Sequence, residues 1–134
     1  MYAKNKGCQW YIDNGCSKNM SGYKRKFLKL TKKEKGKVTF GDNMSANILG
    51  KGTVSLGNNK DKAYNVILVE NVKPNLLCVS QTCDQGHILT FDSQKCEIRR
   101  EYTRKLVAVA PRTSNNVYIL DMEGEEKCCL GQED

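Results

Sequence analysis

Short runs of alternating apolar and polar residues, separated by turn-forming residues, recur along the whole chain. A period of two is typical of strands with one buried face, and strands this short and closely spaced favour a barrel or a sandwich. The breaks at 41–43, 57–60 and 92–95 suit hairpin loops. The predicted strands are Gln9–Ile12, Lys37–Phe40, Ser45–Leu49, Thr53–Leu56, Ala63–Val69, Ile88–Phe91, Cys96–Arg99, Leu106–Val109 and Val117–Leu120. The sequence therefore predicts an all-β domain.

Helical signals are confined to two short segments, so we expect one or two short helices. Tyr23–Leu30 is expected to form a turn or two, with Phe27 and Leu28 facing inward and the lysines outward. Ser80–Gln85 is expected to form a short helix, because Ser80 is a good N-cap and Gly86 suits the left-handed position after a helix.

A chain of 134 residues has room for one domain with a modest core. We place this domain at 9–121, after an N-terminal extension at 1–8 and before an acidic tail or linker at 122–134. The longest aliphatic run, Val66–Val69, is too short for a membrane-spanning helix or the core of a signal peptide. We therefore expect an intracellular, cytoplasmic protein without membrane contact.

The seven cysteines are odd in number and irregularly spaced, which disfavours a disulfide framework. Cys78, Cys83, His87 and Cys96 come nearest to a zinc pattern, but the second tight ligand pair of such sites is missing. We expect reduced, mostly buried thiols, with no metal and no cofactor.

Positive charge is concentrated in residues 1–40, which hold eleven Lys or Arg against Asp13 and Glu34. Such a block can be a solvated face that keeps a basic protein soluble, or it can contact the phosphates of nucleic acid. It lacks a regular pattern of aromatic residues for base stacking, which favours the solvated face. Weak nucleic-acid contact through this basic N-terminal third is the alternative.

The segment Trp10–Cys16 has the clearest chemical meaning. An apolar strand runs directly into Asp13-Asn14-Gly15, which places one carboxylate on a tight turn at the end of a buried strand. Asp, Asn and Gly are also the commonest residues of ordinary turns. Aspartic proteases of the retroviral kind need this arrangement, since two such loops, one from each subunit, meet at a dimer axis. A thiol nucleophile at Cys16 would need a base, and the single histidine, His87, is far along the chain.

The chain resembles the protease region of copia-type retrotransposon Pol polyproteins from about Gln9 to Asp121. The stretches that carry the resemblance occur in the same order in both. They are Trp10–Gly22, Val38–Asp42, Ile48–Val54, Asn75–Gln81, Gly86–Phe91 and Asn116–Asp121. Each is unspecific alone, but the ordered series is specific.

The resemblance implies a small retropepsin-like β-barrel, closed or partly open, that lies between Gag and the integrase in the polyprotein. Its implied activity is that of a homodimeric aspartic endopeptidase that cleaves its own polyprotein. Asp13 would be the catalytic residue, with Asn14 and Gly15 completing the loop. The hairpin Ile48–Leu56 would be the flap over the substrate, with Gly50, Lys51 and Gly52 near its tip. The two glycines fit a simple bulge or turn as well as they fit the tip of a flap.

The chain departs from the family pattern at two positions. Asn14 stands where the family normally has Ser or Thr, whose hydroxyl helps to lock the two loops across the dimer axis. Asn19 stands where the family usually has His. These departures support an alternative, in which the chain is a non-catalytic structural or interaction barrel derived from a transposon polyprotein.

Overall fold

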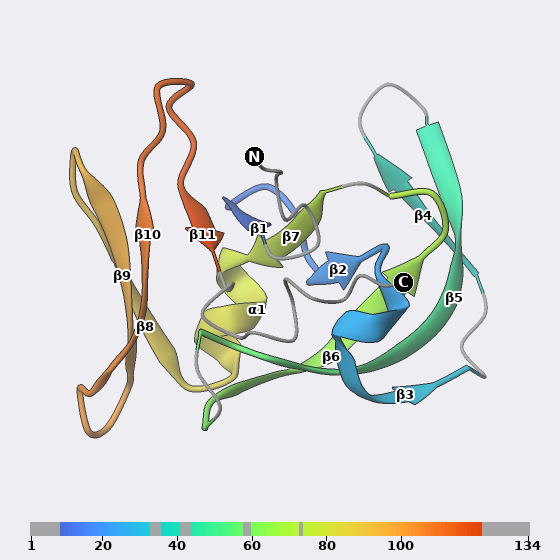
Figure 1. Ribbon diagram of the computed structural model, residues 1–134, viewed down its shortest axis with the longest axis horizontal. Helices are drawn as coiled ribbons and strands as arrows, with labels where there is room; N and C mark the ends of the chain where they lie inside the picture. The colour runs from blue at the N-terminus through green and yellow to red at the C-terminus, as the bar shows by residue number, and fades with distance from the viewer. Residues whose placement is uncertain (1–8, 33–35, 41–43, 58–59, 73, 122–134) are drawn as a thin grey trace.

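The computed structural model describes residues 9–32, 36–40, 44–57, 60–72 and 74–121, which are mostly strands (Figure 1). The predicted extension at 1–8 and the acidic tail at 122–134 lie outside these residues. In chain order the elements are β1 (Gln9–Asp13), β2 (Met20–Ser21), the 3₁₀ turn η2 (Lys24–Lys26), β3 (Phe27–Thr31), β4 (Lys37–Phe40), β5 (Met44–Ser55), β6 (Lys62–Val69), β7 (Asn75–Cys78), α1 (Val79–Asp84), β8 (His87–Phe91), β9 (Lys95–Arg100), β10 (Leu106–Pro111) and β11 (Ile119–Asp121). The all-β prediction is confirmed.

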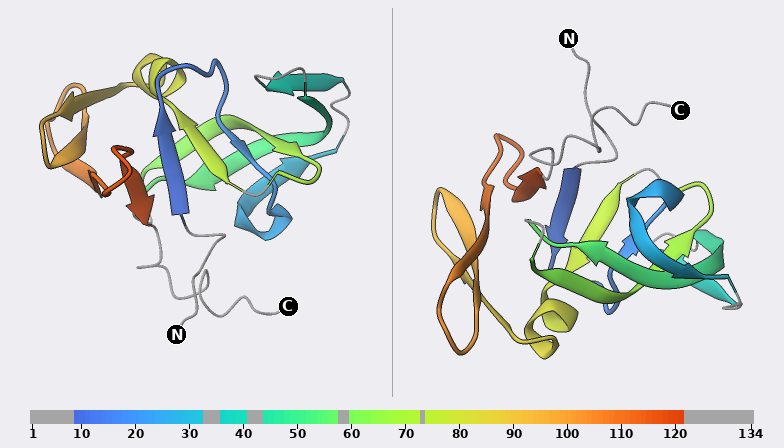
Figure 2. Two further views of the ribbon diagram at one scale, coloured as in Figure 1. Left: turned by 90° about the horizontal axis from the view of Figure 1, so that it is seen from above. Right: turned by 60° about the horizontal axis from the view of Figure 1, so that its bottom comes forward.

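The described strands form two sheets, and neither closes on itself. The larger sheet has the order β11-β1-β7-β2-β6-β5-β3, with β4 paired to β5. The smaller sheet has the order β10-β9-β8 and is set to one side of the larger one (Figure 2). Among the described residues there is no helix with the length and hydropathy needed to cross a bilayer.

The main core joins the two sheets. Trp10 and Leu77 of the larger sheet and Ile98 of the smaller one are fully buried in the same cluster. Strand β6 ends in the aliphatic run Val66–Val69, and all four of its side chains are buried. This run is buried on both sides, because a second cluster around Met20 covers the face of β6 that the main core does not.

The expected helical turns at Tyr23–Leu30 are limited to one 3₁₀ turn, and the expected inward placement of Leu28 is wrong. The segment forms the short turn η2 and then β3, which pairs antiparallel with β5. In a strand, alternate side chains point to opposite sides, so Phe27 packs against the main core while Leu28 is 56% exposed. The short helix expected at Ser80–Gln85 is confirmed as α1, with Gly86 following it at φ +94°. The N-cap is Cys78, however, so the expectation for Ser80 is wrong, and Ser80 lies inside the helix.

The predicted hairpin Ile48–Leu56 is also wrong. Residues 50–52 lie inside the continuous strand β5, which pairs with β3 along one edge and β6 along the other. The register against β6 shifts between Ile48 and Gly50 and again between Gly52 and Val54, as a bulge or a similar irregularity beside these glycines would cause. The hairpin that does project from this part of the molecule is β4–β5 (Figure 1).

Glycine is required at position 52 by the close approach of β3. A Cβ atom there would clash with the carbonyl oxygen of Lys29, and one at Gly50 would lie 2.8 Å from the carbonyl oxygen of Thr31. Both obstacles are backbone atoms, which cannot rotate away. The two glycines therefore allow β3 to pack along the bulged stretch of β5.

We predict that Gly52→Ala lowers the free energy of unfolding by about 1–3 kcal/mol, because the added methyl group forces β3 and β5 apart. Urea denaturation would measure the loss. Ser45→Ala, at an exposed position on the same strand, is the control and should change stability by less than about 0.5 kcal/mol. Equal effects of the two substitutions would contradict the close approach.

Candidate active site

Asp13 is the last residue of β1, and its loop is exposed. Strand β1 runs parallel to β7, with Asp13 opposite Cys78, so the carboxyl ends of both strands meet at one edge. The half-buried Asp13 accepts a hydrogen bond at Oδ1 from the backbone N–H of Gly15, at 2.7 Å. Its other oxygen, Oδ2, has no hydrogen-bond partner among the described residues. One carboxylate oxygen is therefore fixed by the turn, and the other is available for chemistry.

Gly15 leaves the carboxylate uncovered. A Cβ atom at this position would lie 3.3 Å from Asp13 Oδ1, which is tighter than most real Cβ contacts. The Cys16 thiol donates to the Asp13 carbonyl oxygen at 3.5 Å and closes the turn from the other side. Asn14 and Gly15 are both exposed, so the tip of the loop is open to a partner.

Asn19 anchors the loop from inside the protein and is completely buried. The side-chain Oδ1 of Asn19 accepts a hydrogen bond from the backbone N–H of Cys78 at 2.5 Å. The backbone N–H of Asn19 donates to Gln81 Oε1 at 2.6 Å. Its carbonyl oxygen accepts from the Ile67 N–H at 3.0 Å. One residue thus ties the end of the Asp13 loop to β7, α1 and β6. Sequence reasoning saw Asn19 as a departure from the family pattern and missed this role.

A second buried polar group joins the strands on either side of β7. Ser21 Oγ donates to Asn75 Oδ1 at 2.6 Å, and Asn75 Nδ2 donates to the Gln9 carbonyl oxygen at 3.0 Å. The Tyr23 N–H donates to Ser21 Oγ at 3.0 Å. These bonds link β2, β7 and β1. The sequence signal for this role was Asn75 itself, because asparagine is uncommon in strands and here stands directly before the apolar pair Leu76-Leu77.

The flap residues are not brought together with the Asp13 loop. Gly50, Lys51 and Gly52 lie on β5, and the sheet order places β7, β2 and β6 between β5 and β1. A stretch that is hydrogen-bonded along both edges is not a hairpin tip that could close over Asp13. The flap assignment of these three residues is therefore corrected.

Cys16 is a poor nucleophile despite its closeness to Asp13. Burial raises the pKa of its thiol to about 12, and hydrogen bonding to the Cys78 thiol and the charges of Cys78 and Asp13 act in the same direction. The thiol is therefore protonated at neutral pH. His87 is buried, and its Nδ1 lies 3.2 Å from the Thr82 carbonyl oxygen, which gives the ring a structural contact. Within the described ranges, no three His, Cys, Asp or Glu side chains are grouped as metal ligands.

We predict that iodoacetamide at pH 8 alkylates Cys83 at least about tenfold faster than Cys16 or Cys96. Partial burial and the charges of Asp84 and Glu101 raise the pKa of Cys83 as well, but Cys83 is exposed. Burial raises the pKa of both Cys16 and Cys96 to about 12, so little reactive thiolate forms at these two positions. Peptide mass spectrometry would follow each site. Unfolding in urea should make the three rates similar, and rapid alkylation of Cys16 in the folded protein would contradict its burial.

We predict that Asn19→Ala destabilises the protein by about 1–3 kcal/mol, because the buried N–H of Cys78 loses its acceptor. Thermal or urea unfolding would measure this loss. Asn115→Ala removes the same amide from an exposed loop and should change stability by less than about 0.5 kcal/mol. If the two asparagines behaved alike, Asn19 would not be an anchor.

Comparison with known proteins shows a match to one family model. The family model described as "Pol polyprotein, beta-barrel domain" matches residues 10–87, which is more than half of the chain. The matched residues run from β1 to the first residue of β8 and include the Asp13 loop. No curated protein and no solved structure matches the chain. The chain belongs to the family of Pol polyprotein β-barrel domains.

Proposed function

We propose that this domain is the aspartic endopeptidase of a copia-type retrotransposon Pol polyprotein, active as a homodimer on its own polyprotein. The observation that carries the proposal is the Asp13 loop. It presents a carboxylate at the end of a core strand, with Oδ1 held by the Gly15 N–H and Oδ2 unpartnered among the described residues. The family match supports a Pol polyprotein origin.

Two Asp13 carboxylates, one from each subunit, would form the catalytic dyad. Like charges this close share one proton, so one carboxylate is a base and the other an acid. The base takes a proton from water, whose oxygen attacks the scissile carbonyl carbon while the acid protonates the carbonyl oxygen. Collapse of the tetrahedral intermediate breaks the C–N bond, and the departing amine receives a proton from the dyad.

The surroundings of the loop fit a two-fold assembly. Asn14 and Gly15 are exposed at the loop tip, where a second copy can approach, whereas the following Asn19 is buried and fixed. In this dimer the Asn14 amide would occupy the place of the usual hydroxyl and would bond to the partner loop. The buried amides of Asn19 and Asn75 keep β1 and β7 in register, which limits movement of the carboxylate.

A second candidate is a non-catalytic β-barrel with a structural or interaction role in the polyprotein. The observation that favours it is the exposed Asn14 in place of Ser or Thr, because an amide is longer and planar and fits a hydroxyl's position poorly. This candidate predicts a monomer without hydrolysis that depends on Asp13.

We predict that Asp13→Asn lowers the cleavage rate of a Pol-junction peptide by about 10³-fold or more, because an amide cannot serve as acid or base in the dyad. Asp84→Asn, an exposed change on α1, is the matched control and should leave the rate unchanged. The rate should fall on both sides of an acidic optimum, since the dyad works with one proton shared between two carboxylates.

Asn14→Ser should retain or raise activity if the hydroxyl improves the lock between the loops. Sedimentation of the wild type should show dimers at the concentrations where cleavage occurs. Cleavage that survived Asp13→Asn would refute the proposal. An inert monomer in the wild type, with Asn14→Ser equally inert, would establish the non-catalytic barrel instead.

A further inference from the structure

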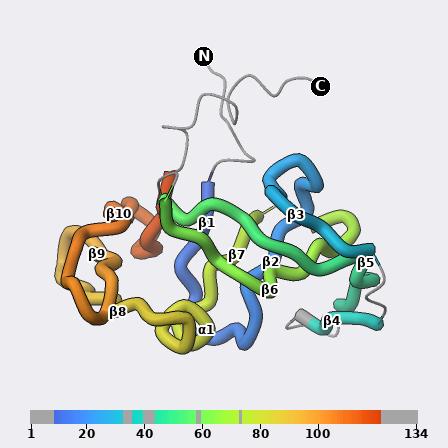
Figure 3. Tube along the Cα trace, turned by 90° about the horizontal axis from the view of Figure 1, so that it is seen from below, coloured from blue at the N-terminus to red at the C-terminus, as the bar shows by residue number. Residues whose placement is uncertain are grey.

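Positive charge is concentrated in one stretch of the sequence that contributes to the larger sheet. Residues 14–60 contain eleven Lys or Arg and two acidic residues, Glu34 and Asp42, both outside the described ranges. This stretch includes β2, η2, β3, β4 and β5, and in Figure 3 the chain of β3 runs alongside β5, which pairs with β6 along its other edge. Their surface therefore carries a potential that attracts anions.

A groove of about 380 Å³ lies in this region, formed by three adjacent strands. It is lined by Lys29 and Thr31 from β3, by Lys51, Gly52 and Thr53 from β5, and by Tyr64 and Asn65 from β6. None of these residues is acidic. The volume is within the range of about 300–1,000 Å³ that is usual for sites holding small organic groups, so it suits a nucleotide better than a bare ion.

The two lysines of the groove alternate with hydroxyl groups. Lys29 lies opposite Thr53, and Thr31 lies opposite Lys51, so each ammonium group has a threonine beside it across the strand pair. Partners in antiparallel register point to the same side of a sheet. A phosphate in the groove would find both a cation and a hydroxyl donor, which is a common combination in phosphate contacts.

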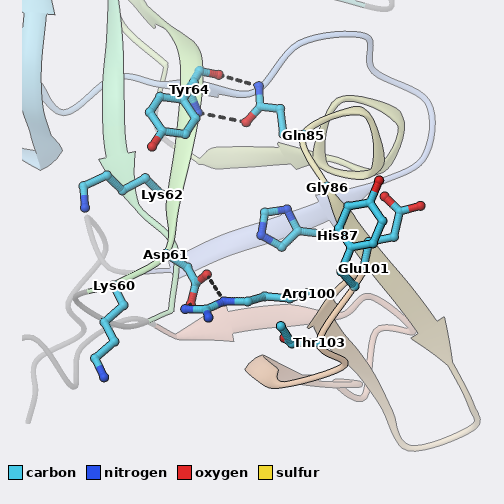
Figure 4. Close-up of a pocket in the computed structure, with 11 residues that line it drawn as sticks. Lys60, Asp61, Lys62, Tyr64, Gln85, Gly86, His87, Arg100, Glu101 and Thr103 are labelled. Atoms are coloured by element: carbon cyan, nitrogen blue, oxygen red, sulfur yellow. Dashed lines mark hydrogen bonds and ion pairs between the residues drawn. The ribbon is translucent and has the colours of Figure 1, made fainter.

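Tyr64 adds an exposed aromatic ring that the basic sequence block itself lacks. The residue is 51% exposed, although large aromatic side chains are usually well covered. Its backbone is clamped by the side-chain amide of Gln85: the Tyr64 N–H donates to Gln85 Oε1 at 2.9 Å, and Gln85 Nε2 donates to the Tyr64 carbonyl oxygen at 2.7 Å (Figure 4). The ring is therefore presented from a fixed backbone.

Tyr64 also lines a second hollow of about 300 Å³, so it lies between the groove and this hollow. That hollow is lined by Lys60, Lys62 and Arg100 among others (Figure 4). Tyr102, which is 91% exposed, also lines it. Asp61 binds Arg100 there at 2.7 and 3.1 Å and offsets part of its charge. The groove, which has no acidic residue among the described residues that line it, is thus the stronger anion site, since Asp61 and Glu101 line the second hollow; Tyr64 borders both.

A pair of neighbouring lysines close to β3 also supports an anion site in this region. The Lys24 ammonium group lowers the pKa of Lys32 through hydrogen bonding and through charge repulsion. Both side chains are exposed, at the start and just beyond the end of the segment η2–β3. A phosphate between such groups would relieve their repulsion.

We propose that the groove between β3, β5 and β6 binds single-stranded nucleic acid, with Lys29 and Lys51 contacting phosphates and Tyr64 stacking on a base. A single strand fits better than a duplex because its bases are free to stack on a ring, and base stacking beside a cationic track is the usual mode of single-strand binding. This activity is separate from peptide cleavage, and its test does not depend on the dyad.

The test is fluorescence anisotropy with labelled oligo(dT) and oligo(U) of about 12 nucleotides, at 50 and 200 mM salt. Lys29→Gln with Lys51→Gln should weaken binding at least about tenfold at the lower salt. It should also reduce the slope of log K against log salt by about 1.4, the value for two lost phosphate contacts on a single strand. The matched control is Lys95→Gln with Lys105→Gln, which removes the same charge from the smaller sheet and should have little effect.

Tyr64→Ala should weaken binding about 5- to 100-fold without changing the salt slope, whereas Tyr64→Phe should retain binding because it keeps the ring. A duplex of equal length should bind more weakly than either single strand, and comparison of oligo(U) with oligo(dT) shows which sugar is preferred. Circular dichroism would verify that each variant is folded. The proposal is overturned if neither oligonucleotide binds at 50 mM salt, if both lysine pairs have equal effects, or if Tyr64→Ala binds like the wild type.

Discussion

The parallel pairing of β1 with β7 is the constraint on which the candidate site depends. Parallel neighbours cannot be joined by a tight turn, and here more than 60 residues separate the paired segments in the sequence. The pairing brings the carboxyl ends of both strands to one edge, where Asp13 begins its loop and Cys78 leads into α1. A slip of one residue would turn Trp10 out of the core and move Asp13 away from its turn.

Two buried asparagines specify this register. Asn19 supplies the acceptor for the N–H of Cys78, and Asn75 bonds both Ser21 and the backbone of Gln9. A polar group buried with its partner costs little, but the same group without a partner costs the full desolvation energy. Another pairing of these strands would leave the Cys78 N–H and the Asn75 amide without these partners, whereas in the observed one the Nδ2 of Asn19 is the group left without a partner among the described residues. The amides therefore act with the burial of Trp10 to favour the observed register.

The two proposed activities use different parts of one sheet. The Asp13 loop is on β1, while the cationic groove is on β3, β5 and β6, with β7 and β2 between them. Glycine matters at both sites because an added Cβ atom would be crowded in each, but what it would meet differs between them. Gly15 leaves the carboxylate uncovered, whereas Gly50 and Gly52 let the backbone of β3 approach β5 and so form one wall of the groove. A binding surface and a cleavage site could thus operate on one domain without competing for the same side chains.

The sequence by itself determined the all-β class, the short helix that ends before Gly86, the chemical character of the Asp13 loop and the excess of positive charge in the first third. Each of these follows from neighbouring residues, because strand periodicity, turn chemistry and charge are local properties. The tertiary structure decided that Gly50–Gly52 lie inside a strand, that Asn19 is an anchor, and that Tyr64 joins Lys29 and Lys51. These depend on which strands pair and in which register, and pairing is set by contacts between residues far apart in the chain, which no local pattern encodes.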